Sequence, residues 1–392
     1  MKKNIFNNEF IFYVLEKTYI DNLNPIEIEK NFFEDEYRTG AFASKVLELF
    51  SEKDLRVCKN NLDIEYQKIY FGAPGTGKSY ELNKESKDNF SDKNVERVTF
   101  YPNYSYANFV GTYKPIEENK NITYKFVPGI LVRQLKNAYE NPDKNYLLII
   151  EEINRANVSA VFGDTFQLLD RDSSGESEYP ISLSEDLFKY FDENLKTKDY
   201  LNKEYVEENK LIKLYFPRNL YIWATMNSAD QGVQPLDTAF KRRWTFEYID
   251  VNNGVTKELI KYEFRVKKGD KNYIKWNDLR EKINIVLSDA KIPEDKLMGS
   301  YFISKNVLEK SGPEKLKEII KNKVLMYLYE DVLKISRNKL FNPEYSKTFS
   351  NLCRQFDEDA SSIFIDEVKN FIIEKSVIDD NNSQIQDIKK EN

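Results

Sequence analysis

Hydrophobic positions along the chain follow two patterns, and each predicts one kind of element. Continuous apolar runs at 69–71, 146–150 and 219–225 are typical of buried strands in a parallel sheet, which need apolar side chains on both faces. A shorter run at 97–100 predicts a further strand. Helical spacing lies between these runs, and strands alternating with helices predict an α/β fold.

Helical spacing of apolar residues dominates both ends of the chain. Residues 1–64 predict a small N-terminal helical module, and the strands place the core domain at 65–250. Residues 251–376 predict an all-helical C-terminal subdomain, with helices at 254–266, 276–290, 313–336 and 358–375. The polar residues 377–392 predict a disordered tail.

Three stretches of the core domain depart from the alternation of strands and helices. Residues 116–127 alternate around a polar turn and predict a hairpin, which Pro128-Gly129 follows as the start of a helix. Residues 172–215 form a charged insertion with a helical pattern at 184–210; we expect a surface feature, with a partner or pore contact as the alternative. The aromatic-rich residues 101–115 favour core and interface packing over a base-stacking platform.

The most informative stretch is Gly-Ala-Pro-Gly-Thr-Gly-Lys-Ser at 72–79, directly after the strand at 69–71. It matches G-x-x-x-x-G-K-[ST], in which a glycine loop turns successive N–H groups toward a phosphate and a helix adds its positive end. Lys78 is expected on the β- and γ-phosphates and the Ser79 hydroxyl on Mg²⁺. The residues predicted to bind the nucleotide are Gly72, Ala73, Pro74, Gly75, Thr76, Gly77, Lys78, Ser79 and Tyr80.

Polar residues follow two of the other predicted strands. Glu151 and Glu152 end the strand at 146–150. At that place, downstream of a P-loop, carboxylates manage Mg²⁺ and the attacking water. Asn227 follows the strand at 219–225 and could orient that water. Asn227 and Asp230 also resemble a pattern that recognises guanine. We discount this resemblance, because the position of Asn227 at the end of a strand already explains it.

Arg242 and Arg243 form a basic cluster after the last of these strands. Arginine keeps its charge and presents a fixed fork of donors, so it can stabilise transition-state charge at a neighbouring subunit's nucleotide. The alternative is a solvated basic helix end.

Composition narrows the chemistry. The chain has 392 residues and no histidine, which excludes histidine-activated nucleophiles and histidine-ligated metal sites. Its net charge of −6 argues against a free-standing, non-specific DNA binder. Cys58 and Cys353 show no metal spacing, and no run has the length of a membrane span. We expect a cytoplasmic protein.

Together these motifs resemble the McrB group of AAA+ NTPases, the nucleotide-hydrolysing subunits of McrBC-type modification-dependent restriction systems. The resemblance runs from about 69 to 329. It rests on the P-loop and on these further segments: Tyr-Ser-Tyr-x-x-Phe-x-x-Gly-x-Tyr-x-Pro at 104–115, Phe-Val-Pro-Gly at 126–129, Glu-Ile-Asn-Arg-Ala-Asn at 152–157, Met-Asn-Ser-Ala-Asp at 226–230, Arg-Arg at 242–243 and Ser-Tyr-Phe at 300–302.

The resemblance implies a P-loop AAA+ core with a helical lid and a hexameric ring with Mg²⁺ and ATP or GTP at subunit interfaces. It also implies a separate McrC-like nuclease, so that any DNA is engaged through the complex. Lys78 and Ser79 would be Walker A, Glu151 and Glu152 Walker B, and Asn227 sensor 1. Arg242 or Arg243 would be the arginine finger acting in trans.

The sequence departs from the family pattern at three places. Glu151 stands where the family has Asp, which puts magnesium binding by this residue in question because Mg²⁺ demands near-ideal geometry. The lid segment Gly-His-Ser-Tyr-Phe appears as Met298-Gly299-Ser300-Tyr301-Phe302. The 64 N-terminal residues are too few for a large reader of modified DNA.

The leading hypothesis is therefore an Mg²⁺-dependent NTPase motor of a restriction or phage-defence complex. One alternative is a nucleotide-gated assembly scaffold with weak hydrolysis. Another is a MoxR-like chaperone that remodels a protein partner. The residues leave the choice between ATP and GTP open.

Overall fold

The computed structural model describes residues 8–19, 21, 23–33, 39–49, 64–118, 120–196, 201–208, 210–228 and 232–376. Contacts divide the chain into two compact units. The first contains the described residues up to Ile69, Asn83–Ala224 and Gln234–Thr245; the second contains Tyr70–Leu82, the described part of Thr225–Val233, and the described residues from Phe246 onward. Of the predicted features, Cys58, Ala229, Asp230 and the tail at 377–392 lie outside the described residues.

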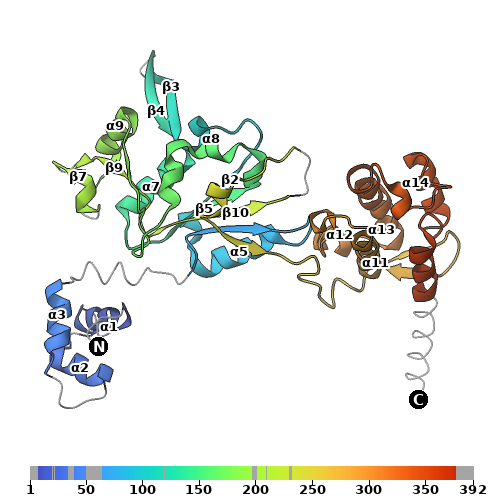
Figure 1. Ribbon diagram of the computed structural model, residues 1–392, viewed down its shortest axis with the longest axis horizontal. Coiled ribbons are helices and arrows are strands. Elements are labelled where there is room, and N and C mark those ends of the chain that lie inside the picture. Colours follow the sequence, from blue (N-terminus) through green and yellow to red (C-terminus); the bar gives the residue numbers. More distant parts are fainter. Residues whose placement is uncertain are drawn as a thin grey trace. The chain divides into compact units, whose positions relative to one another are not determined.

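A five-stranded sheet organises the centre of the chain (Figure 1), in the order β11-β1-β10-β5-β2. The predicted strands are confirmed, and β11 is an additional one. Strand β5 pairs in parallel with β10 and β2, with Ile150 opposite Ala224 and Val98. The strands are β1 (Gln67–Phe71), β2 (Val95–Thr99), β5 (Tyr146–Glu151), β10 (Leu220–Met226) and β11 (Thr245–Tyr248).

The central strands are continuous apolar runs because both faces of the sheet are covered. Leu147 to Ile150 and Leu220 to Ala224 are fully buried. The P-loop is followed by α5, and the predicted helix after Pro128-Gly129 is α7, whose apolar face is buried. The helices that follow the strands here are α5 (Lys78–Asn89), α6 (Tyr106–Phe109), α7 (Ile130–Glu140), α8 (Val158–Phe162) and α10 (Thr238–Lys241).

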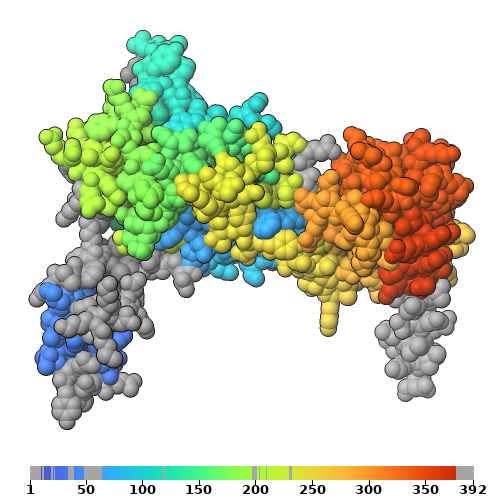
Figure 2. Space-filling model, in the orientation of Figure 1, coloured from blue at the N-terminus to red at the C-terminus, as the bar shows by residue number. Residues whose placement is uncertain are grey.

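The predicted hairpin is present as β3 (Gly111–Glu118) and β4 (Asn121–Pro128), longer than the pattern indicates. It projects from the body of the first unit (Figures 1 and 2), and Ile122 and Tyr124 are 76% and 69% exposed. At its base the aromatics serve packing, as favoured from the sequence: Phe109 is buried, with its ring 4.7 Å from that of Phe162.

The charged insertion is only partly helical. Helix α9 (Glu185–Asn194) ends well before 210, so the predicted helix over 184–210 is wrong in its second half. Just after this helix, Leu195 is extended, and the N–H of Lys196 donates to the carboxylate of Glu140 on α7 at 2.8 Å. The described residues on either side of this helix form two short strand pairs. Strand β6 (Ile181–Ser182), before the helix, pairs with β9 (Lys213–Leu214), and β7 (Val206–Glu207) pairs with β8 (Lys210–Leu211).

The N-terminal region is helical where it is described, as predicted. Its helices are α1 (Asn8–Tyr19), α2 (Pro25–Phe33) and α3 (Ala41–Leu49). They share a small core of their own, made of Phe10, Val14, Leu15, Ile28, Ala43 and Val46.

The C-terminal part of the second unit is mainly helical, as predicted, around one large apolar core. Its helices are α11 (Trp276–Asp289), α12 (Lys305–Glu309), α13 (Pro313–Ile319), the π-helical segments Ile320–Leu325 and Leu328–Val332, α14 (Phe349–Glu358) and a last helix at 366–376. In the described chain no helix is both long and apolar enough to cross a membrane.

Two of the C-terminal helix predictions need correction. No helix forms over 254–266; this stretch contains turns and the strand β12 (Glu263–Arg265), which pairs with β13 (Tyr273–Lys275). The helix predicted at 358–375 begins only at 366, because residues 359–364 turn and Phe364 bridges to Phe341.

Candidate nucleotide site

The chain between β1 and α5 folds as the anion cradle that the P-loop pattern predicts. Gly75 and Gly77 have φ angles of 79° and 94°, in the region that glycine adopts without strain. The buried hydroxyl of Thr76 donates to the carbonyl of Ala73 at 3.0 Å, which closes the loop from inside. Helix α5 begins at Lys78, so its positive N-terminal end adds to the loop.

Lys78 links this loop to the tip of another strand. Its ammonium donates to the carbonyls of Gly72 and Ala73, both at 2.9 Å, and to Oδ1 of Asn227 at 3.3 Å. Asn227 directly follows β10. The fold therefore brings together two residues from separate motifs that the sequence assigns to one site.

Glu151 has a partner that the sequence does not reveal. Its carboxylate forms an ion pair with Arg97 of the adjacent strand β2, and Arg97 also donates to Oδ1 of Asn83 on α5. Glu151 thus balances a charge on the neighbouring strand. Any contribution it makes to a metal competes with this pair.

Glu152 has an unusual backbone. It is a non-glycine residue with φ 55° and ψ 47°, in the left-handed region. Such a conformation costs on the order of 1–3 kcal/mol, and strained residues of this kind cluster at active sites and ligand clamps, although Lys120, Glu208 and Lys291 also have positive φ here. The carboxylate of Glu152 lies 3.5 Å from Nε of Arg155. Because β5 and β10 are parallel neighbours, Glu152 and Asn227 both follow strands that end at the same edge of the sheet.

The two arginines of the basic cluster have opposite surroundings. The Arg243 side chain is 8% exposed; it donates to Asp170 Oδ2 at 2.6 Å and to the carbonyl of Ala239 at 2.8 Å, over the ring of Phe166. Arg242 is exposed, and its guanidinium makes no hydrogen bond or ion pair with the residues that the structure describes. Of these two arginines, Arg242 is the one whose guanidinium faces solvent.

The two residues assigned to magnesium from the sequence both carry oxygen donors, which this ion prefers. Ser79 lies on the exposed first turn of α5, and Glu151 is a partly buried carboxylate. The described residues contain no group of three His, Cys, Asp or Glu side chains that could hold a metal by themselves. Mg²⁺ is usually held through one or two carboxylates together with substrate phosphates and water, so the fit of this ion depends on the bound nucleotide.

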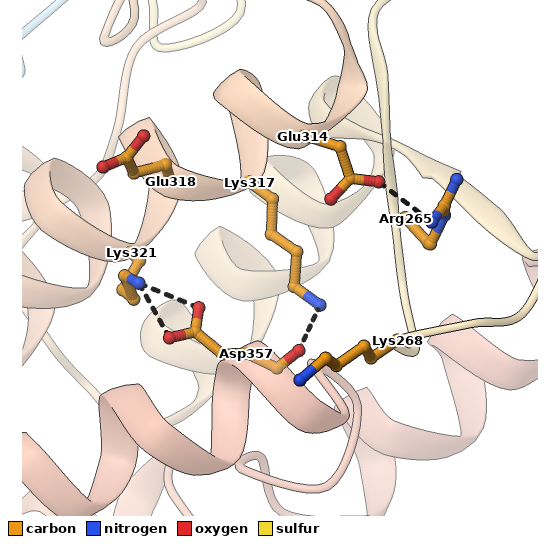
Figure 3. Close-up of a pocket in the computed structure, with 7 residues that line it drawn as sticks. All are labelled: Arg265, Lys268, Glu314, Lys317, Glu318, Lys321 and Asp357. Carbon is orange, nitrogen blue, oxygen red and sulfur yellow. Dashed lines mark hydrogen bonds and ion pairs between the residues drawn. The ribbon is translucent and has the colours of Figure 1, made fainter.

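A polar hollow of about 300 Å³ lies among the helices of the second unit, away from the P-loop residues (Figure 3). The Lys and Arg side chains that line it already have hydrogen-bond or ion-pair partners. Lys321 bonds both carboxylate oxygens of Asp357, and the buried Lys317 donates to the backbone carbonyls of Val266 and Asp357. Arg265 and Lys268 pair with Glu314 and Glu358. This hollow is therefore held together by its own charges and does not call for a ligand.

The predicted site residues are distributed as follows. Gly72 to Tyr80 form one continuous loop and helix start, where Tyr80 is 65% exposed, and Asn227 joins them through Lys78. Glu151 and Glu152 end β5, whereas Arg242 and Arg243 flank the end of α10. The sequence missed Arg97, and no local pattern in the sequence marks it as the partner of Glu151. Arg155 belongs to the motif at 152–157 but has no role assigned from the sequence.

Comparisons with known proteins agree with this geometry. A family model of the AAA domain (dynein-related subfamily) matches residues 69–244. The chain is 41% identical over 323 residues to the type II restriction enzyme BsuMI component YdiS of Bacillus subtilis (strain 168), covering 75% of this chain and 86% of that protein.

Two further proteins are more distant. The type IV methyl-directed restriction enzyme EcoKMcrB subunit of Escherichia coli (strain K12) is 29% identical over 242 residues, which is 59% of this chain and 46% of that protein, so the chain spans about half its length. The C. elegans PCH-2 structure is 13% identical, with 87% of this chain and 71% of that chain covered and a TM-score of 0.22. With the AAA match and the relative in Bacillus subtilis, the chain belongs to the McrB-like family of AAA NTPases.

Proposed function

We propose that this chain is an Mg²⁺-dependent NTPase that acts as the ring-forming motor subunit of a restriction complex. The observation that carries the proposal is the contact of Lys78 with Asn227, which joins the phosphate loop to the strand tip expected to manage the attacking water. The names of its relatives, both components of restriction enzymes, support the biological setting.

The residues divide the work as follows. The loop at 72–79 and Lys78 hold the phosphates, and the Ser79 hydroxyl is the first metal donor. Glu152 accepts a proton from the attacking water as general base, and Asn227 orients that water. The strained backbone of Glu152 supports a functional role for this residue. Bound magnesium would neutralise charge that develops on the phosphates.

Arg242 is the proposed arginine finger. An exposed guanidinium is available to a neighbouring subunit's nucleotide, whereas that of Arg243 is taken up by Asp170 and Phe166. A finger supplied in trans requires a head-to-tail assembly, which closes into a ring when the rotation permits. A separate nuclease subunit would then couple this hydrolysis to DNA cleavage.

The experiment is Glu152→Gln in purified protein with Mg²⁺ and ATP or GTP. The amide keeps the size of the side chain but removes the base, so nucleotide affinity should stay unchanged while turnover falls by about 10²- to 10⁴-fold. Binding is measured with a fluorescent nucleotide analogue and turnover by phosphate release. Competition of ATP and GTP for that analogue identifies the preferred nucleotide.

The matched control is Glu374→Gln, the same change at an exposed glutamate of the last helix. It should leave both binding and turnover unchanged. Undiminished hydrolysis in Glu152→Gln would refute the assignment of the base.

A test in cells addresses the restriction setting. Glu152→Gln should abolish plasmid restriction in cells that carry the chain with its neighbouring genes.

A second candidate function is a nucleotide-gated scaffold with weak hydrolysis, and the Arg97–Glu151 pair favours it. If Arg97 keeps Glu151 from the metal, nucleotide binding would still order the assembly while turnover stayed slow. Oligomer size with a slowly hydrolysed analogue, compared with the turnover of the unmodified chain, separates the two functions. Ring formation without measurable turnover would favour the scaffold.

A further inference from the structure

The segment Met298–Phe302 lies directly on the P-loop within the second unit. The N–H of Gly299 donates to the carbonyl of Pro74 at 2.9 Å, and the N–H of Tyr301 donates to the carbonyl of Gly75 at 2.7 Å. Both contacts are made by backbone. We call residues 298–302 the clamp segment.

Two glycines permit this approach. A Cβ on Gly299 would lie 2.3 Å from backbone atoms of Gly75 and Thr76, and a Cβ on Gly75 would lie 2.4 Å from the N of Phe302. At such distances the neighbouring backbone would have to shift to make room for a side chain. The clamp segment and the phosphate loop are therefore matched surfaces, and a shift of one must move the other.

The clamp segment is held at both ends. At Met298 the anchor is buried: Asn284 bonds its N–H and its carbonyl at 3.0 and 2.8 Å, and Arg280 donates to the same carbonyl at 2.8 Å. At Phe302 the anchor is Lys323, whose ammonium donates to the carbonyl at 2.5 Å and lies 5.2 Å from the ring centre.

The two anchors differ in kind. Arg280 is fully buried, so its removal would disrupt the core. Lys323 is partly exposed and pairs with no carboxylate in the described chain, and desolvation lowers its pKa. It sits on the π-helical segment Ile320–Leu325, and π-helical turns occur often at functional sites.

We propose that Lys323 is a positioning residue for the nucleotide. By holding the carbonyl and ring of Phe302, it keeps the Gly299 and Tyr301 amides on the P-loop carbonyls and so fixes the geometry of the phosphate cradle. Lys323 need not touch the nucleotide. This inference rests on the proposed function, since it concerns the same binding site, and it adds that the helical region sets the affinity of that site.

The test compares Lys323→Met, Lys323→Arg and the unmodified chain, with Kd from the fluorescent analogue and KM and kcat from phosphate release. Loss of one charge-assisted hydrogen bond should weaken Kd and raise KM by about tenfold, with kcat at saturating nucleotide within about twofold of the unmodified chain because no group that takes part in the proposed chemistry is removed. Arginine can donate to the same carbonyl and stack on the same ring, so Lys323→Arg should restore both values.

Two further variants complete the design. Lys334→Met makes the same change at an exposed lysine of the same region and should alter nothing. Gly299→Ala places a methyl group against the backbone of Gly75 and Thr76 and so disturbs the contact between the clamp segment and the P-loop directly. It should raise KM at least as much as Lys323→Met. Thermal midpoints without nucleotide show that each variant is folded.

The outcomes are separable. If the unmodified chain binds nucleotide and Lys323→Met binds it equally well, the positioning role is wrong while the proposed function stands. A variant that only loses thermal stability, with unchanged Kd, also overturns the role. If the unmodified chain binds no nucleotide, the proposed function itself fails.

Discussion

At the scale of single residues, two adjacent arginines illustrate how the surroundings decide a role. Arg242→Ala should leave the thermal midpoint unchanged, because its guanidinium bonds nothing in the described chain, and should lower turnover by about 10³-fold or more if it is the finger. Arg243→Ala should destabilise the fold by about 3 kcal/mol, because Asp170 would be left without its partner in a mostly buried place.

The measurement for both variants is the same: urea unfolding for stability and phosphate release for turnover at saturating nucleotide. Lysine at either position is the conservative control, since it keeps the charge but not the fork of donors. The assignment is reversed if Arg243→Ala remains stable but inactive while Arg242→Ala hydrolyses normally.

The sequence identifies residues that lie within one continuous motif better than it identifies their neighbours. The P-loop is readable because its spacing encodes a backbone shape, and the contact of Lys78 with Asn227 follows from two strand ends at one sheet edge. Arg97 could not be found in this way. It faces Glu151 only because β2 and β5 are adjacent in a given register, which no local pattern determines.

At the scale of elements, long periodic segments are predictable and short ones are ambiguous. Helices α7 and α11 match their patterns closely. Residues 254–266 carry helical spacing, yet Tyr262, Phe264 and Val266 also alternate, and the alternation is the pattern realised: Phe264 pairs with Ile274, and both are buried. A short apolar run can satisfy either period, and tertiary pairing decides between them.

Helix α10 allows a test of pH dependence at this scale. It is only four residues long, and Asp237 caps it by accepting from the N–H of Phe240 at 2.6 Å and from the Ser159 hydroxyl at 2.9 Å. The Phe240 N–H, followed by the Ser159 hydroxyl, lowers the pKa of Asp237. The folded chain therefore favours the ionised carboxylate more than the unfolded chain does.

The sign of the effect follows from this direction. A carboxyl whose folded pKa is depressed contributes stability above its unfolded pKa, about 3.9, and loses it as the pH falls through the folded value. Asp237→Asn keeps a neutral cap. We expect the unmodified chain to be more stable than Asp237→Asn at pH 7 and the difference to shrink as the pH falls below the unfolded pKa of about 3.9 and through the lower folded pKa. Urea unfolding at several pH values checks this; a difference that persists in acid would contradict it.

At the scale of the whole molecule, the division into compact units does not follow the sequence order. The P-loop segment Tyr70–Leu82 groups with the C-terminal helical region, although β1 leads into it from the first unit. The motif order in the sequence predicts one core domain at 65–250. The backbone bonds of Pro74 and Gly75 to the clamp segment show why contacts divide the chain differently.

The strongest test of the assembled molecule uses two inactive variants together. Glu152→Gln lacks the base but keeps Arg242, and Arg242→Ala lacks the finger but keeps Glu152. If the finger acts across an interface, each site is built from two chains. An equal mixture should then contain complete sites at about a quarter of its interfaces, because each partner is chosen at random.

Turnover should therefore reappear on mixing, to about a quarter of the unmodified rate if the sites work independently. The control mixture pairs Glu152→Gln with the double variant Glu152→Gln/Arg242→Ala; no interface then has a base, and no turnover should appear. If both single variants assemble in size-exclusion chromatography with nucleotide but their mixture stays inactive, Arg242 does not act across a subunit boundary. The ring would then hold nucleotide at sites that each chain completes alone.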